Sequence, residues 1–301
     1  MRVLVKADHP SFGIGDIICM MPYVEKFRCY YQAEVYLKIK NEKMSNLFSN
    51  SFPDIKIFSG PIDLKFDKEI NLLHTRLDQS LQRIFASQLG FMNAEYIKPM
   101  IDFFPSERPI KARYAVISVQ STSQLKYWNH SSGKKSHSTS PNWNDLCRML
   151  RKSGITPICV DNYEIFGYGN FKNYVPKQAL KKIGLPLEEV IGILNHAEFF
   201  IGLSSGLSWL AHAMGKRVCM ISNFTEEWYE FDTSIENYKR ITDKSVCHGC
   251  WNRVGIDFDF IHEDWYWCPR HQGTDRQFEC HTSITPERVF NEIKEWINDK
   301  D

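Results

Sequence analysis

Short apolar runs alternate with amphipathic stretches along the first third of the chain. The runs are rich in β-branched and aromatic residues, which predicts buried strands, whereas the stretches between them have helical periodicity. The expected strands are 2–7, 33–39, 55–60, 62–66 and 70–76, and the expected helices are 16–31 and 77–90. Strands and helices that alternate at this spacing form βαβ units, so a parallel sheet is expected.

The same alternation restarts after residues 104–110, which contain two prolines and two charges and are typical of a linker. The expected strands are 114–120, 156–161, 198–203 and 217–222, and the expected helices are 141–154, 185–197 and 204–215. A final amphipathic helix is predicted for 285–300, with Thr285 as its cap and Pro286 at its first position. The pattern predicts an α/β protein with two Rossmann-like domains that face a cleft.

Composition narrows the class of protein. The 301 residues suit one large domain or two smaller ones, and 37 Lys+Arg nearly cancel 36 Asp+Glu. A nucleic-acid-binding protein usually has a basic excess, so nucleic acid is not an expected partner. No stretch approaches the roughly 20 apolar residues of a membrane span, and Val3–Val5 is too short for a signal-peptide core. We expect a cytoplasmic protein without a membrane span.

The segment "FGIGDII" places Gly13 and Gly15 between the first strand and the first helix. Backbone N–H groups in such a turn can approach a phosphate closely. Ile18 stands where the dinucleotide fingerprint needs its third glycine, which argues against a nicotinamide cofactor. Asp16 follows directly. Its carboxylate suits a general base, but an acidic residue in a first helical turn is also a good cap, and position alone leaves both roles open.

A second pair of segments indicates a phosphate-rich ligand. Ser121, Thr122 and Lys126 follow the strand at 114–120. A small-residue turn then begins the helix that follows the strand at 198–203, and it consists of Ser204, Ser205, Gly206 and Leu207. Helix N-termini of this kind bind phosphate through their N–H groups. Two such turns, one in each domain, favour a nucleotide-sugar donor held in the cleft between the domains.

Nine cysteines, an odd number in a chain expected to be cytoplasmic, argue against a disulfide framework. Four of them cluster late in the chain: Cys247, Cys250, Cys268 and Cys280. A CxxC pair with two later cysteines predicts one structural zinc or iron ion with four thiolate ligands. Nearby histidines are possible replacements for a thiolate, namely His248, His262, His271 and His281. Scattered reduced thiols and a redox CxxC pair remain alternatives.

Four segments together resemble the bacterial autotransporter heptosyltransferase family, whose distant relatives are the lipopolysaccharide heptosyltransferases of glycosyltransferase family nine. The segments are "GIGDIICMMP", "QSTSQLKYWN", "IGLSSGLSWLAHAMGKRVCMISNFTEEWYEF" and "CHGCWN…FDF…DWYWCPRHQGTDRQFEC". The resemblance implies a GT-B fold with an N-terminal acceptor-side domain, a C-terminal nucleotide-sugar domain, a metal finger and a last helix that crosses back onto the first domain. The corresponding ranges are 1–110, 111–284, 247–280 and 285–301.

The resemblance also implies an activity and residue roles. The expected reaction is an inverting transfer of a sugar, heptose above all, from a nucleotide-diphosphate donor such as ADP-heptose to a hydroxyl, for example Ser or Thr of an autotransporter protein. Asp16 would be the base, Lys126 would neutralise the leaving diphosphate, and the turn at Ser204–Gly206 would add backbone donors. The four cysteines would hold iron, no catalytic metal is expected, and self-assembly into a homo-oligomer is a further expectation.

Two alternatives remain at this point. One is a glycosyltransferase of surface-polysaccharide assembly, with another nucleotide sugar and a glycan acceptor. The other is a non-catalytic binding module in which the cysteine-rich segment recognises a partner. Two phosphate-ready turns would have no role in a pure adaptor, which favours an enzyme.

Overall fold

The computed structural model describes residues 1–75, 77–103, 106–121, 126–129, 141–169, 171–232, 237–261 and 264–299. The strands are β1 Arg2–Ala7, β2 Glu34–Ile39, β3 Lys56–Phe58, β4 Lys68–Asn71, β5 Tyr114–Ser118, β6 Thr156–Cys159, β7 Ile165–Tyr168, β8 Phe171–Tyr174, β9 Leu180–Lys181, β10 Phe200–Leu203, β11 Val218–Ile221 and β12 Tyr238–Ile241. The helices are α1 Ile14–Tyr31, α2 Glu42–Ser51, α3 Leu81–Gln88, α4 Pro141–Lys152, α5 Leu187–Asn195, α6 Gly206–Ala213, η1 Cys250–Arg253, α7 Glu279–Thr282, α8 Pro286–Glu292 and α9 Lys294–Asn298.

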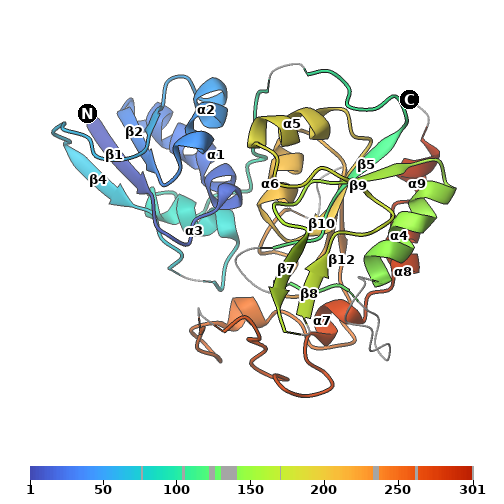
Figure 1. Ribbon diagram of the computed structural model, residues 1–301. Coiled ribbons are helices and arrows are strands. Elements are labelled where there is room, and N and C mark those ends of the chain that lie inside the picture. Colours follow the sequence, from blue (N-terminus) through green and yellow to red (C-terminus); the bar gives the residue numbers. More distant parts are fainter. Residues whose placement is uncertain are drawn as a thin grey trace.

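Two separate parallel sheets form the framework (Figure 1). The first has strand order β3-β2-β1-β4, and the second has order β12-β11-β10-β5-β6-β9. β1 is central in the first sheet, and its Val3 and Val5 are fully buried in a hydrophobic cluster that also contains residues of α1 and α3. The prediction of a parallel α/β fold is confirmed.

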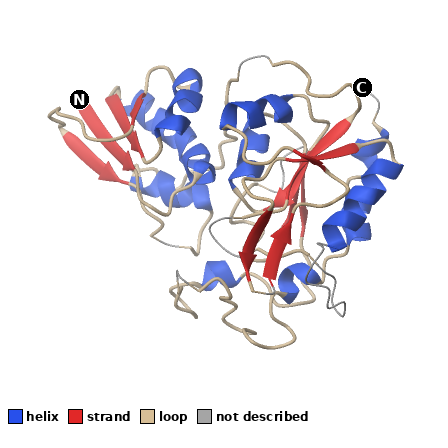
Figure 2. Cartoon of the chain, in the orientation of Figure 1, coloured by secondary structure: helices blue, strands red, loops and turns tan. Residues whose placement is uncertain are grey.

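The second sheet lies between two layers of helices, as Figure 2 shows. Side chains on β5 alternate between the two faces, because successive residues of a strand point in opposite directions. Tyr114 and Val116 lie in the cluster that contains α5 and α6, whereas Ala115 and Ile117 lie in the cluster that contains α4 and α8. The first of these clusters continues into the first sheet, so the two sheets share one apolar interior across α1 and α6.

The last helical segment corrects one prediction. Residues 285–301 were expected to cross back onto the first domain, but Val289, Ile293 and Trp296 are buried in the hydrophobic cluster of the second sheet, beside α4. Arg113 also donates to the carbonyl of Ile297 at 3.1 Å. The predicted apolar face is present, but its partner is the second sheet (Figure 1). Amphipathic periodicity shows that a helix needs a partner without showing which one.

Other elements also differ from the prediction. Residues 62–66 form no strand, and the antiparallel hairpin of β7 and β8 was not anticipated. The remaining elements that were not anticipated are α2, β9, β12, η1 and α7. The hairpin packs through aromatic rings on the cysteine-rich segment, residues 247–280, with 4.8 Å between the ring centroids of Phe171 and Phe278. That segment is mostly loop (Figure 2). No helix in the described part of the chain is long and apolar enough to cross a membrane.

Candidate functional site

The two glycine turns predicted from the sequence meet in the structure. A β-carbon placed on Gly15 would lie 3.1 Å from the Cα of Gly206 and 3.1 Å from the ring of Trp209. One placed on Gly206 would lie 2.5 Å from a methyl group of Ile14. Only glycine permits this approach of two backbones. The N-terminal ends of α1 and α6 therefore converge, and their free N–H groups and partial positive charges face a common region.

Asp16 lies in the first turn of α1 and has two partners. Its Oδ2 accepts the backbone N–H of Gly13 at 2.8 Å, and its Oδ1 lies 3.1 Å from Nε2 of His74. His74 follows β4, the neighbour of β1, and the carboxyl ends of parallel neighbours meet at one edge of the sheet. Asp16 is thus a helix cap, as one of the two interpretations predicted, and its carboxylate is also held by a side chain that the prediction did not include.

Lys126 is buried beneath the second turn. Its Nζ donates to the hydroxyl of Ser204 at 2.9 Å and to the carbonyl of the same residue. The Ser204 hydroxyl in turn donates to the carboxylate of Glu230, which also accepts from Arg240 at 3.0 Å and from Thr225 at 2.9 Å. An ammonium has three donors, and the acceptors found in the described part of the chain leave one N–H of Lys126 for a ligand.

Burial and neighbouring charges set the ionisation of this group. Burial lowers the pKa of Lys126 to about 8, although the charges of Glu230 and Asp16 partly oppose that shift. Burial also disfavours the ionised form of Glu230, but Arg240 and Lys126 together hold its pKa below the usual value. Asp16 of the first domain is thus one of the charges that favour the ionised form of Lys126 in the second domain.

The other predicted donor-binding residues differ in what they contact. Ser121 is buried, and its hydroxyl donates to the carbonyl of Ser204 at 3.3 Å. Ser205 is half-buried at the start of α6, and its shielded Oγ has no hydrogen-bond partner among the described residues. Gly206 and Leu207 begin the same helix and are half-buried. Thr122 lies outside the described residues.

The four clustered cysteines line one small cavity of about 20 Å³, which is room for a single ion. The Sγ atoms of Cys247 and Cys250 lie 3.8 Å apart. Two thiolates at about 2.3 Å from one tetrahedral metal would be about 3.8 Å apart. The contact with Cys250 and the nearby Arg270 lower the pKa of Cys247, and the same contact raises the pKa of Cys250, so it is the spacing of the two sulfur atoms that supports a metal here. These two cysteines therefore fit a metal.

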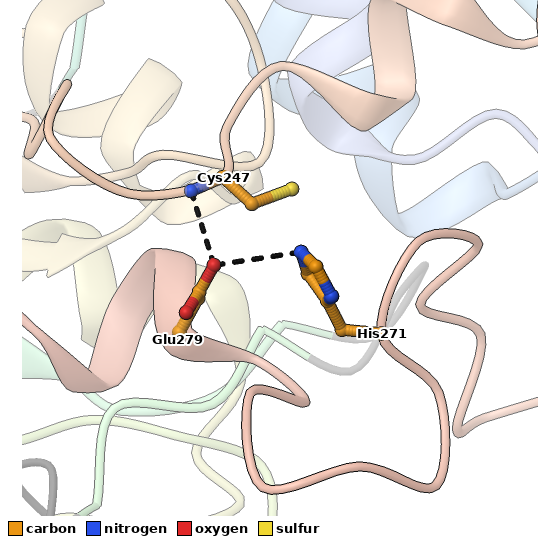
Figure 3. A group of neighbouring side chains, drawn as sticks. All are labelled: Cys247, His271 and Glu279. Carbon is orange, nitrogen blue, oxygen red and sulfur yellow. Dashed lines mark hydrogen bonds and ion pairs between the residues drawn. The ribbon is translucent and has the colours of Figure 1, made fainter.

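A second arrangement in the same place uses different groups (Figure 3). The ligand atoms of Cys247, His271 and Glu279 lie within 4.8 Å of one another. The Glu279 carboxylate already accepts from Cys247 N at 3.2 Å and from Arg276 at 2.6 Å, and it lies 3.5 Å from His271. These contacts give the Glu279 carboxylate a structural role, because they link it to three other positions of the cysteine-rich segment. Within the described ranges the four cysteine sulfur atoms do not all lie within 4.8 Å of one another. The complete set of four cysteine ligands therefore remains a prediction.

Sequence reasoning missed three residues of the site. His74 lies near the carboxyl end of the predicted strand 70–76, and strand order could have placed it beside Asp16, since carboxyl ends of parallel strands gather at one edge. Glu230 and Arg240 carried no such signal, because an acid in "TEEWYEF" looks like a surface charge until the tertiary structure buries it against Lys126. A buried polar network depends on contacts between distant segments.

Known proteins resemble this chain in sequence and in fold. No family model matches the chain. The chain is 37% identical over 298 residues to the autotransporter heptosyltransferase Aah of Escherichia coli. This match covers 95% of this chain and 72% of Aah. The chain is also 33% identical over 293 residues to the autotransporter heptosyltransferase TibC of E. coli O78:H11. That match covers 93% of this chain and 68% of TibC.

Solved structures match over the whole length. A crystal structure of TibC, described as a dodecameric iron-containing heptosyltransferase in complex with ADP-D-beta-D-heptose, has a TM-score of 0.85 at 29% identity and covers 99% of this chain and 76% of that chain. A glycosyltransferase family 9 protein from Veillonella parvula has a TM-score of 0.64 at 12% identity, covers 99% and 97%, and shares the fold. The fold and the relatives thus define a glycosyltransferase with the architecture of GT-B heptosyltransferases. The chain belongs to the autotransporter heptosyltransferase family.

Proposed function

We propose that this enzyme transfers heptose, with inversion at the anomeric carbon, from ADP-heptose to Ser or Thr hydroxyls of an autotransporter protein in the cytoplasm. The observation that supports the proposal is the contact between the Gly15 and Gly206 turns, because Asp16 follows the first turn and Ser204, which accepts from buried Lys126, precedes the second. The ADP-heptose complex of the relative TibC supports the choice of donor.

The proposed step uses residues from both sheets. Asp16 takes the proton of the acceptor hydroxyl as its oxygen attacks the anomeric carbon, and the bond from that carbon to the diphosphate oxygen breaks. The free N–H of Lys126 and the N–H groups at the start of α6 stabilise the charge on departing ADP. The hydroxyl and the carbonyl of Ser204 both accept hydrogen bonds from Lys126, so the role of Ser204 is to hold the ammonium in place.

The organisation of the chain follows from these roles. We assign residues 1–110 to the acceptor side and 111–284 to the donor side, and we group 285–299 with the donor side because that segment packs on the second sheet. The dodecameric state of TibC supports self-assembly of this chain.

The test is a transfer assay with ADP-heptose and a purified autotransporter passenger domain, in which ADP release and the mass of the acceptor are both measured. Addition of one heptose mass per modified residue, with the α or β configuration opposite to that of the donor, is the expected result. ADP release without protein modification would show that heptose is transferred to water, and it would contradict the proposed protein acceptor. A response to UDP- or GDP-sugars but not to ADP-heptose would contradict the proposed donor.

The pKa of Lys126 predicts the pH dependence of transfer. Because burial lowers this pKa to about 8, the ammonium loses its charge as pH rises through that value, and kcat/KM is expected to fall about tenfold for each further pH unit. Lys126→Arg keeps a charge at all these pH values and should lack this decline, at a lower maximal rate. A decline that persists unchanged in Lys126→Arg would assign it to another group.

We also propose that the cysteine-rich segment holds one structural metal ion, iron by analogy with the iron-containing relative. The cavity shared by the four cysteines and the 3.8 Å separation of Cys247 and Cys250 support it. When bound, the ion would cross-link loops that contain little regular secondary structure, and we give it no part in sugar transfer.

Metal analysis of the purified protein should therefore give about one iron per chain. Cys250→Ser is expected to lower the metal content and the Tm together, because metal binding stabilises only the folded segment. Cys29→Ser is the matched control, since Cys29 is exposed on α1 and lies outside the cluster. Equal metal content in the two variants would remove Cys250 from the ligand set.

A further inference from the structure

His74 and Asp16 form a pair at the carboxyl edge of the first sheet. Nε2 of His74 lies 3.1 Å from Oδ1 of Asp16, and the two side chains are 22% and 19% exposed. The imidazole ring is held by edge contacts with Phe12, at 5.0 Å between centroids, and with Phe85, at 5.6 Å. We propose that His74 is a positioning residue for Asp16, an inference that rests on the proposed role of Asp16 as the base.

Hydrogen-bond accounting identifies which nitrogen carries the proton. Nδ1 of His74 is shielded from solvent and has no partner among the described residues. A proton on Nδ1 of a neutral ring would leave a buried donor without an acceptor and would also leave bare Nε2 facing the carboxylate oxygen of Asp16. An ionised Asp16 needs donors. The arrangement therefore assigns the neutral Nε2–H tautomer, with His74 donating to Asp16.

The same geometry rules His74 out as the base. Nε2 is taken by Asp16, and Nδ1 faces away from solvent, so neither nitrogen can take a proton from an acceptor hydroxyl. Asp16 instead receives one donor on each oxygen, from Gly13 N–H and from His74. A carboxylate has about four lone-pair positions, so two remain for the acceptor. His74 thus fixes the rotation of the carboxylate about its last bond and leaves its basic function intact.

If His74 positions Asp16, two amide variants of His74 should differ in activity. His74→Gln places a donor near the position of Nε2, whereas His74→Asn places its amide near Nδ1 and leaves Asp16 Oδ1 without a partner. We expect His74→Asn to lower kcat for heptose transfer by about 10- to 100-fold with little change in donor KM, because misplacement of a reacting group acts on the transition state. His74→Gln should restore most of that rate.

Three comparisons decide the matter. If His74→Gln and His74→Asn lose the same activity, or if His74→Asn keeps the wild-type kcat, His74 does not position Asp16. If Asp16→Asn keeps full activity, the proposed base is wrong, and the role of His74 falls with it. If Asp16→Asn keeps a measurable residual rate and Asp16→Asn/His74→Asn has the same residual rate, His74 acts only through Asp16, as proposed, whereas a further loss in the double variant would contradict that. A Tm equal to that of wild type in each variant separates positioning from folding.

A second measurement does not depend on activity. Two-bond 1H–15N spectra of the histidine rings distinguish the tautomers, and the His74 signals are those absent from His74→Gln. We expect an unprotonated Nδ1 and a protonated Nε2 at neutral pH, with a shift of the Nε2 signal in Asp16→Asn. A protonated Nδ1 would overturn the inference even if the chain transferred no sugar.

Discussion

Asp16→Asn is expected to lower the rate of heptose transfer by about 10²- to 10⁴-fold, because loss of a general base typically removes that factor. The substitution is nearly isosteric. Its amide oxygen can still accept the N–H of Gly13 that Asp16 accepts at 2.8 Å, so the cap of α1 should survive. Initial-rate kinetics with ADP-heptose, together with a Tm measurement, separate loss of the base from loss of the fold.

Glu42→Gln is the matched control for this experiment. Glu42 is an acidic residue in the first turn of α2 in the same half of the chain, but it is exposed and lies outside the site. Its substitution should leave transfer unchanged. A similar loss in both variants would indicate a general effect of first-turn charge on stability, and a fully active Asp16→Asn would require another base.

Glu230→Gln is expected to destabilise the fold by about 3–5 kcal/mol, because it leaves Arg240 buried without its counter-ion. The side chains of Arg240 and Glu230 are only 3% and 5% exposed, and the pair is closed by a 3.0 Å contact. Removal of the Glu230 charge also lowers the pKa of Lys126 further, since that charge raises it in the wild type. Transfer at neutral pH should therefore fall together with the free energy of unfolding.

Urea denaturation measures the stability part of this prediction. The matched control is Glu227→Gln, which removes an exposed partner of Lys244 at 2.9 Å, with side chains 40% and 64% exposed. Exposed pairs contribute about 0–1 kcal/mol, so Glu227→Gln should differ little from wild type. If Glu230→Gln also changed the free energy of unfolding by less than about 1 kcal/mol, the buried ion pair of Glu230 and Arg240 would not stabilise the fold around Lys126 as proposed.

The sequence was sufficient to predict most of the framework. The runs at β1, β2, β10 and β11 are apolar because parallel strands covered by helices are buried, and that signal is local. The hairpin of β7 and β8 was harder to predict, since its strands are short, contain Gly167 and have an exposed residue at each end of β7. Its stability comes from packing on the distant cysteine-rich segment. The partner of α8 and α9 was likewise a tertiary property.

The candidate site was also predictable only in part: its local turns could be found in the sequence, but its tertiary contacts could not. Glycine turns and helix N-termini are local features, so Gly15 and Gly206 were found, and their contact with each other explains why both must be glycine. Lys126 was expected to face a diphosphate directly, but most of its donors are used on Ser204. Glu230 became visible only when the fold placed it beneath that lysine.

The contact between Gly15 and Gly206 has a consequence for motion. Two backbones in van der Waals contact cannot approach further, and the apolar interior shared across α1 and α6 opposes their separation. Any opening of the two halves is therefore expected to be a rotation about this contact, as in hinge movements of domains. The distance between Asp16 and Lys126, close to the axis, would change little, while the outer edges of the two sheets would move furthest.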